Sequence, residues 1–503
     1  MGTLVRQITS LSDAFYGVSV LNQDPPKTVQ GASTKAIAIV GEFPWGPEDE
    51  VQSFTSIHEL LAAVYPRAFG AIDTTTYFAM KALLGKKFPR DIKLVRVGAT
   101  SAAKATKTFQ DGESSPADSV IATATYKGSL GNLISIAWTA NADTAANRDM
   151  TVKIGTTYEV TYENVVVDDT GSITVTDPGD PYVSVVADGS ATDVPAVVGD
   201  TLLASGSDGT AVAGDYVGSI SSDKGIRLFY GESVDVDVLF VAECPSGLVD
   251  TVNAGLKSYA DDTGKGHAVL CSVPDQAASA VLAYHTTYKN TKGRTVYCWP
   301  RVKTLDTNDP DRTEITVDGN AFMACAMCGI DPWLSPGGAQ SAQFFTGITG
   351  LANSSAAAST LETLREGGTA CFFTDRALGT IIRDAVATDG QKIRTVRTRD
   401  WIGKSLSALL VNYAEAPLDL ILASEELGPI TGPELAAVKS WLEEQKGFSR
   451  IKAFSVDPWS QNTESTIDAG QWVILLLVET YSDQDKIILA LTVGETVSIA
   501  DAA

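Results

Sequence analysis

Apolar residues follow strand spacing and helix spacing in turn over the first hundred positions. Residues 36–40 (AIAIV) and 92–97 are short apolar runs typical of buried strands. Between them, residues 56–64 carry apolar side chains at helical spacing with Ser56 at the N-cap position, and residues 74–84 predict a second helix. An order of strand, helix, helix and strand is typical of an α/β core.

The same alternation returns after residue 235. Residues 236–242, 247–260 and 267–273 predict a strand, a helix and a strand, which implies a right-handed parallel crossover. We expect further elements as a strand at 295–299, an apolar helix at 320–328, a strand at 370–373 and a basic strand at 392–398 that leads into a helix from Trp401. The chain then ends in a helix at 432–445 and strands at 450–456, 472–480 and 486–493, the last two forming a hairpin.

Residues 100–225 have a different character. Small and polar residues dominate, and the apolar runs are short, as at 133–138, 162–167 and 182–186. This pattern predicts an inserted all-β domain. The region holds 17 acidic and 6 basic residues, which suits a solvated outer surface.

The two ends of the chain predict extended arms. The first thirty or so residues alternate only weakly and contain Pro25 and Pro26. We therefore predict an α/β (α+β) multi-domain fold, with a mixed-sheet core, an inserted all-β domain and extended terminal arms. The expected divisions are an N-terminal arm (1–32), a first core part (33–100), the β-rich insertion (101–225), a second core part (226–390), a C-terminal α/β domain (391–494) and a C-terminal arm (495–503).

Composition narrows the class of protein. The chain has 503 residues, beyond the roughly 250 to 300 at which one hydrophobic core stops growing. A formal net charge of −23 opposes broad attachment to nucleic acid or anionic lipid and favours protein partners. The N-terminus lacks the apolar core of a secretory signal, and the longest apolar run, 472–478, is too short to cross a bilayer. We therefore expect a protein made in the cytosol.

Candidate catalytic and metal-binding residues are few. The three histidines, His58, His267 and His285, lie at no metal-binding spacing, and we interpret each as structural. Cys325 and Cys328 form a C-x-x-C pair inside an apolar stretch, which favours packing over redox chemistry. The glycines of the segment 41–46 are spaced as in a phosphate loop but are followed by Pro and Glu, so this segment is a turn. We expect no enzyme activity, no cofactor and no metal.

One basic cluster stands out in this acidic chain. It consists of Lys392, Arg394, Arg397, Arg399 and Lys404. A solvated strand face needs no function, but a stripe of this kind also suits an acidic protein surface, because complementary charge sets the register between partners.

Several segments, in order, resemble those of contractile phage-type tail sheath proteins. They are FYGVSV (15–20), the stretch 33–64, RVGATSAAKAT (96–106), YKGSLGNLISIAW (126–138), GIDPWLSPGG (329–338), GGTACFFTDRAL (367–378), KIRTVRTRDWIGKSL (392–406) and the terminal helix and strands. Each motif is short, so their order carries the resemblance. Asn22 stands where the family often has an acidic residue.

The resemblance implies a subunit that polymerises as a helical sleeve around a tail tube. Contraction of that sleeve from a metastable extended state drives the tube through the host envelope. The implied partners are further copies of the chain, the tail tube protein, and baseplate and tail terminator proteins, with no direct nucleic acid and no membrane insertion. The implied location is a virion tail assembled in the host cytoplasm. The basic cluster would then face the tube or a neighbouring subunit.

Subunits that move as rigid bodies need a connection that survives the movement. Strand exchange supplies one, because backbone hydrogen bonds do not demand a flat, matched surface. With the resemblance, the residues expected to exchange strands are Phe15, Tyr16, Val18, Val20, Leu21, Val473, Leu475, Leu477, Ile488, Ala490, Thr496, Val497 and Ile499. The alternative is that the two ends of the chain are disordered tails that exchange no strands.

Two other classes of protein remain open from the sequence. The first is a cytosolic α/β enzyme with a site at the strand ends near Cys244 or Cys271, which an accessible low-pKa thiol would favour. The second is an acidic surface-layer or adhesion protein, which would require export.

Overall fold

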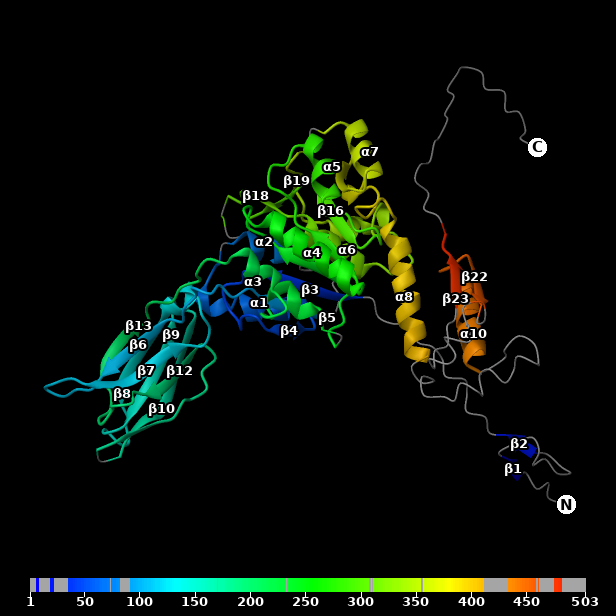
Figure 1. Cartoon of the computed structure of the whole chain (residues 1–503). Helices are drawn as coiled ribbons and strands as arrows, with labels where there is room; N and C mark the ends of the chain where they lie inside the picture. Colours follow the sequence, from blue (N-terminus) through cyan, green and yellow to red (C-terminus); the bar gives the residue numbers. More distant parts are fainter. Residues whose placement is uncertain are drawn as a thin grey trace, which may run out of the picture. The chain divides into compact units, whose positions relative to one another are not determined.

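The computed structural model describes residues 6–8, 19–21, 35–72, 74–81, 91–169, 171–231, 233–306, 309, 311–353, 356–410, 433–457, 460 and 475–481. The chain divides into two compact units. One unit is Ser33–Asp400, and the other combines Met1–Ala32 with Trp401–Ala503 (Figure 1). Within the described residues, no helix is both long and apolar enough to span a bilayer.

The larger unit is built on an eight-stranded mixed sheet. Its spatial order is β21, β20, β16, β15, β14, β3, β5 and β4. The six inner strands run parallel, and the two edge strands run antiparallel to their neighbours. The bounds are β3 Ala36–Gly41, β4 Val51–Phe54, β5 Asp91–Arg96, β14 Val238–Ala242, β15 His267–Leu270, β16 Thr295–Trp299, β20 Ala370–Asp375 and β21 Gly379–Ile382.

Apolar packing covers both faces of this sheet. Along β3, Ile37 and Ile39 point into one buried cluster, and Ala38 and Val40 point into another. Continuous apolar strands such as AIAIV are therefore explained by burial on two sides. The first cluster includes residues of α1 (Ile57–Val64), α2 (Thr75–Lys81) and α6 (Asn320–Gly329), and the second includes residues of α3 (Ala213–Val217), α4 (Val249–Thr263), α5 (Ala278–Thr286) and α7 (Ala358–Glu366).

The cap predicted for the first helix is confirmed. The Ser56 hydroxyl accepts a hydrogen bond from the Glu59 backbone N–H at 3.2 Å. The Glu59 carboxylate in turn accepts from the Thr55 backbone N–H at 2.9 Å. These bonds satisfy donors at the helix start that have no partner within the helix.

A smaller three-stranded sheet packs into the same apolar cluster as one face of the main sheet. It consists of β17 (Val302–Leu305) between β18 (Glu314–Val317) and β19 (Gly350–Leu351). The apolar helix α6 follows β18 directly and is buried at every position, because it packs beneath the main sheet.

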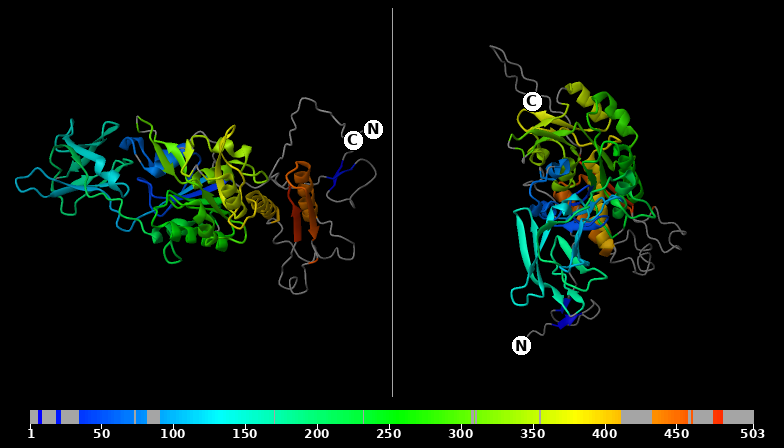
Figure 2. Two further views of the ribbon diagram at one scale, coloured as in Figure 1. Left: turned by 90° about the horizontal axis from the view of Figure 1, so that it is seen from above. Right: turned by 90° about the vertical axis from the view of Figure 1, so that its left-hand side faces the viewer.

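The insertion folds as two antiparallel sheets. The order is β11, β10, β9, β8 and β13 in one sheet and β12, β7 and β6 in the other. Figure 2 shows this region, in cyan and teal, as strands and loops. The strands predicted at 133–138, 162–167 and 182–186 are confirmed as β8 (Ile134–Ala140), β10 (Tyr158–Asp168) and β12 (Val183–Ala187). The other strands are β6 Thr106–Gln110, β7 Asp118–Ala124, β9 Arg148–Ile154, β11 Ile173–Val175 and β13 Val198–Leu202.

The insertion has its own apolar core but shares it with the main domain. Trp45 and Phe69, which precede the insertion in sequence, belong to its buried cluster. Trp45 contacts the rings of Phe69, Tyr126 and Tyr182 at centroid distances of 4.8, 5.4 and 5.9 Å. By α3 the chain has returned to the main domain, since Tyr216 packs in the second cluster of the sheet.

The smaller unit contains a helix and a strand pair near the C-terminus. Helix α10 (Pro433–Gly447) lies beside the antiparallel strands β22 (Ala453–Asp457) and β23 (Leu475–Glu479) (Figure 1). Two short strands of the N-terminal arm, β1 (Arg6–Ile8) and β2 (Ser19–Leu21), pair in parallel. The strand predicted at 486–493 lies outside the described residues.

The prediction of a strand at residues 392–398 is wrong. These residues begin helix α8 (Ile393–Leu410). Ile393, Val396 and Arg397 are buried at the i, i+3, i+4 spacing of a helix. In KIRTVRT, basic residues alternate with other residues, and over so short a stretch this resembles the pattern of a strand. The buried residues Trp401, Ile402 and Leu406 continue the helical spacing.

Candidate functional site

The strand pair β22–β23 is the described part of the predicted exchange surface. Ser455 lies opposite Leu477, and Phe454 lies opposite Val478. Val438 and Trp441 of α10 are buried, and Trp441 packs against the ring of Trp401 at 5.2 Å. Leu477 remains 60% exposed. Among the described residues, each of the two strands pairs only with the other.

The residues predicted to exchange strands fall into two groups. Val20 and Leu21 lie in β2, and Leu475 and Leu477 lie in β23. The others lie outside the described residues: Phe15, Tyr16, Val18, Val473, Ile488, Ala490, Thr496, Val497 and Ile499. Strand exchange therefore stays a prediction for the whole set.

The five basic residues do not form the single strand face that the sequence predicted. Arg397 is buried and donates hydrogen bonds to the carbonyl oxygens of Ile330 (2.7 Å) and Asp331 (3.4 Å). Burial lowers the pKa of Arg397 to about 10. Lys392 pairs with Asp384, while Arg399 points outward with 55% of its side chain exposed. Arg394 and Lys404 are half-buried. Arg397 therefore stabilises the fold, and contact with a partner remains a prediction for the other four.

A buried charged cluster lies at the carboxyl ends of β14, β15 and β16. Glu243 accepts from Arg301 Nη2 at 2.5 Å and from the Asp318 backbone N–H at 2.5 Å. Asp318 accepts from the backbone N–H groups of Ser272 (2.8 Å) and Asn320 (3.1 Å). Burial raises the pKa of Glu243 to about 7, although the Arg301 guanidinium opposes this shift. The cluster ties three strand ends and the start of α6 together.

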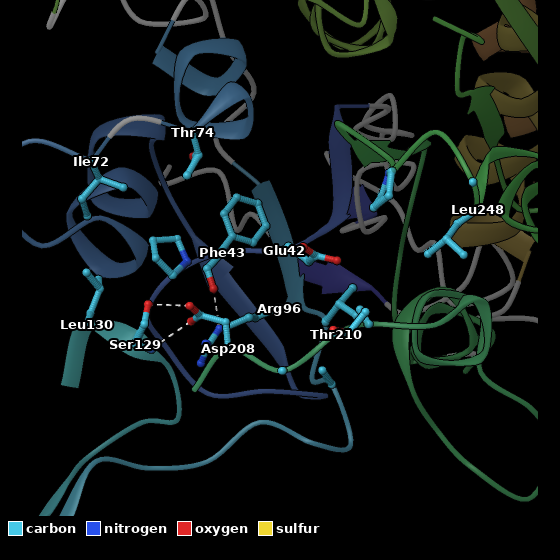
Figure 3. Close-up of a pocket in the computed structure, with 17 residues that line it drawn as sticks. Glu42, Phe43, Ile72, Thr74, Arg96, Ser129, Leu130, Asp208, Thr210 and Leu248 are labelled. Atoms are coloured by element: carbon cyan, nitrogen blue, oxygen red, sulfur yellow. Dashed lines mark hydrogen bonds between the residues drawn. The ribbon is translucent and has the colours of Figure 1, made fainter. Parts of the chain in front are cut away.

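A crevice of about 610 Å³ lies where β3, β5 and β14 end and the insertion begins (Figure 3). This is the point at which neighbouring connections of an open α/β sheet diverge, a common place for ligands. Here, however, Arg96 uses its donors on backbone carbonyls: Nε to Phe43 (2.6 Å), Nη1 to Gly46 (2.7 Å) and Nη2 to Lys127 (2.9 Å). Arg96 therefore joins the insertion to the main domain.

A second contact reinforces this seam, the junction between the insertion and the main domain. Asp208, at the end of the insertion, accepts from the backbone N–H of Ser129 at 3.0 Å and from its hydroxyl at 2.5 Å (Figure 3). Gly128 adopts a φ of +133°, and a Cβ there would lie 2.8 Å from the Asp208 carboxylate. Glycine at this position lets the two connecting segments approach each other.

Comparisons with known proteins give a consistent result for the fold. No family model and no curated protein sequence matches the chain. Among solved structures, a sheath tail protein from Desulfitobacterium hafniense superposes with a TM-score of 0.61 at 15% identity, over 92% of this chain and 100% of that one. The chain has the fold of a sheath tail protein.

Other structures with the sheath fold agree. A sheath tail protein from Listeria innocua matches at a TM-score of 0.56 and 15% identity, over 90% of this chain and 97% of that one. The helical sheath of the anti-feeding prophage in its contracted state matches at 0.54 and 11% identity, over 96% and 99%. The sheath fold confirms the predicted α/β (α+β) multi-domain class.

The thiols of this sheath fold are poor candidates for catalysis. Burial raises the pKa of Cys328, and Cys325 beside it in α6 is buried as well, which agrees with packing. The pKa of Cys271 is raised by the neighbouring Cys244 thiol and by burial. A raised pKa keeps a thiol protonated at neutral pH and lowers its nucleophilicity. The strand-end enzyme considered from the sequence is therefore not favoured.

The histidines are placed mainly by packing. His267 and His285 are buried, and burial lowers the pKa of both, to about 4 for His285. His58 is exposed on α1. In the part of the chain that the structure describes, no group of His, Cys, Asp and Glu side chains could hold a metal ion.

Sequence reasoning missed Arg96 and the cluster around Glu243. Glu243 meets a partner 58 positions away and another 75 positions away, so no local spacing reveals the cluster. The local signal for Arg96 is a cation at the buried end of the strand 91–96.

Proposed function

We propose that the chain is the sheath subunit of a contractile tail. Subunits polymerise as a helical sleeve around a tail tube and contract from a metastable extended state, which drives the tube through a host envelope. The observation that carries the proposal is the sheath fold, shared over 90% or more of both chains with proteins that include a contracted helical sheath.

The connection between subunits is proposed to be strand exchange. The predicted hairpin of residues 472–480 and 486–493, whose first strand contains β23, would offer its edges to residues 15–21 of one neighbouring copy and residues 495–499 of another. A five-residue arm strand forms about four hydrogen bonds at a net ~1 kcal/mol each, so each arm contributes on the order of a few kcal/mol. Repetition over every subunit makes a continuous mesh.

The other partners follow from the same role. The sleeve surrounds a tube protein and meets baseplate and terminator proteins at its two ends, within a virion tail assembled in the host cytoplasm. Arg399 is the best exposed member of the basic cluster, and we place it against the tube or an adjacent subunit, where an acidic surface would pair with it. The acidic insertion lies on the outside of the sleeve.

The first experiment is negative-stain electron microscopy of the purified full-length chain. We expect long hollow cylinders. A chain without residues 1–32 and 495–503 should remain folded by circular dichroism but form no cylinders. A full-length chain that stays monomeric under every polymerising condition, or a doubly truncated chain that still polymerises, would contradict the proposal.

A point variant tests the strand pair more sharply. Leu477 is 60% exposed in the single subunit, so Leu477→Asp should change the free energy of unfolding by no more than about 0.5 kcal/mol while abolishing cylinders. The matched control is Val186→Asp, a 55% exposed apolar residue in β12 of the insertion, which should assemble normally. Cylinders formed by Leu477→Asp would show that this face is not covered in the polymer.

A further inference from the structure

The main sheet carries opposite charges at its two edges. The edge strands β21 and β4 lie at the two ends of the eight-stranded order. Arg376 precedes β21 and Arg383 follows it, and both are exposed, with 49% of the Arg383 side chain accessible. Glu50 directly precedes β4, and Glu59 accepts a hydrogen bond from Thr55, the residue after β4. We call the first surface the arginine edge and the second the glutamate edge.

The charges follow the same order along both edges. β21 is antiparallel to β20 and β4 is antiparallel to β5, while the six strands between the edges are parallel. In this register β21 and β4 both start beside the carboxyl end of the neighbouring strand. Arg376 and Glu50 therefore lie at the carboxyl ends of the parallel strands, and Arg383 and Glu59 lie at their amino ends.

The arginine edge also presents an apolar side chain on an ordered turn. In the β20–β21 hairpin, the Asp375 carboxylate accepts from the backbone N–H groups of Ala377 (2.7 Å) and Leu378 (2.9 Å). Leu378 is 44% exposed and lies two positions after Arg376. A partner that covers this turn would bury apolar surface in addition to pairing the charge.

The four charges are accessible to a partner. In the part of the chain that the structure describes, neither Arg376 nor Glu50 forms an ion pair. The Arg383 guanidinium has a long contact, at 3.8 Å, with the Glu362 carboxylate. Glu59 is exposed on α1. Each of these side chains can therefore pair with an opposite charge on another molecule.

We propose that the arginine edge of one copy docks against the glutamate edge of a second copy. When the two edge strands run the same way, Arg376 meets Glu50 and Arg383 meets Glu59, so both pairs are complementary. Because the two surfaces differ, the contact is heterologous and can repeat from copy to copy in a ring or a helix. The inference rests on the proposed sheath role, to which it adds a connection that does not use the chain ends.

Charge reversal tests the pairing. Arg376→Glu and Glu50→Arg should each raise the protein concentration needed for cylinders by at least about tenfold, because like charges then face each other. The double variant with both changes should return to within about threefold of the parent chain, since the pair is restored with its signs exchanged. Combining Glu50→Arg with Arg383→Glu should not restore assembly, because Arg383 faces Glu59.

The matched control is Arg312→Glu, which reverses an exposed arginine in the loop before β18. It should assemble like the parent chain, and circular dichroism should show that every variant is folded. An equal loss of assembly in the control would overturn the proposal by assigning the effect to net charge. Normal assembly of both single reversals, or rescue by the mismatched combination, would overturn it as well.

A chemical cross-link separates this contact from the sheath role. Arg376→Lys keeps the charge and supplies an amine that a carbodiimide can join to a carboxylate in direct contact. In a mixture of isotope-labelled and unlabelled copies, mass spectrometry should show position 376 of one copy linked to Glu50 of another. Absence of this link overturns the contact, and cylinders that form without it leave the sheath role standing. The link without cylinders would instead contradict the sheath role and support the contact.

Discussion

Buried charged residues fix the positions of strand ends in the main sheet through hydrogen bonds and ion pairs. Glu243 combines a left-handed backbone with a carboxylate that is removed from water and held by Arg301 and by a backbone N–H. Such a residue is costly alone and is retained only where its surroundings determine its conformation. At the residue scale, the charged cluster therefore acts as a rigid joint between β14, β16 and α6.

This joint predicts a dependence of stability on pH. The pKa of Glu243 is about 7 in the folded chain, above the ordinary value of 4.5, so the folded state binds a proton more tightly than the unfolded state does. The contribution of Glu243 to the free energy of unfolding is fully present below the pKa of the unfolded state. It is lost as the pH rises through about 7, a change of about 3 kcal/mol. Urea denaturation from pH 5 to 8 measures it.

The matched variant for this prediction is Glu243→Gln, which removes the titrating group. Its unfolding free energy should change less between pH 5 and 8 than that of the parent chain. Equal slopes for the two proteins would assign the pH dependence to another group, of which Asp318, whose pKa burial also raises, is the nearest.

At the scale of elements, α8 shows how one helix divides its cations between two tasks. Arg397 lies on the buried side and bonds the carbonyl oxygens at the end of α6, whereas Arg399, two residues later, points outward. A rotation of about 200° separates two such positions on a helix. The helical period, and not the local concentration of charge, therefore decides which cation is available to a partner.

Charge reversal should separate the two arginines. Arg397→Glu places a buried carboxylate against two carbonyl oxygens and should lower the free energy of unfolding by at least about 3 kcal/mol. Arg399→Glu should change it by no more than about 0.5 kcal/mol. Urea denaturation of both variants measures the difference, and similar losses would contradict the burial of Arg397. Arg399→Glu then serves as the stable variant for assembly on tubes.

At the scale of the whole molecule, the larger unit behaves as one body because the insertion shares its core with the main domain. Trp45 and Phe69 pack inside the cluster of the insertion, and Arg96 bonds carbonyls on both sides of the seam. In the proposed sheath, an insertion fixed in this way would follow the movement of its subunit instead of swinging freely.

Removal of the Arg96 side chain should loosen that seam. Arg96→Met leaves three backbone carbonyls without their donor, so we expect a loss of about 2 to 4 kcal/mol and faster proteolysis of the segments that connect the insertion. The control is Lys127→Met, which removes only a partly exposed ion pair with Glu48 and should cost less than about 1 kcal/mol. Equal protease resistance of Arg96→Met and the parent chain would refute this role.

Much of the architecture was determined by the sequence alone. The apolar runs of β3, β5 and β14 and the cap of α1 act over a few residues, so their periodicity and chemistry are visible locally. The change to short strands after residue 100 likewise marked the insertion. The ordered short motifs indicated the sheath fold although no family model matches the chain.

Only the tertiary structure decided which side chains meet. The Arg96 bonds and the Glu243 cluster each join residues separated by tens of positions, and their partners are set by strand order and register. The strand wrongly predicted at 392–398 has the same origin, because over seven residues only burial against α6 distinguishes a helix from a strand. Local periodicity fixes the elements, while packing between distant elements selects the contacts.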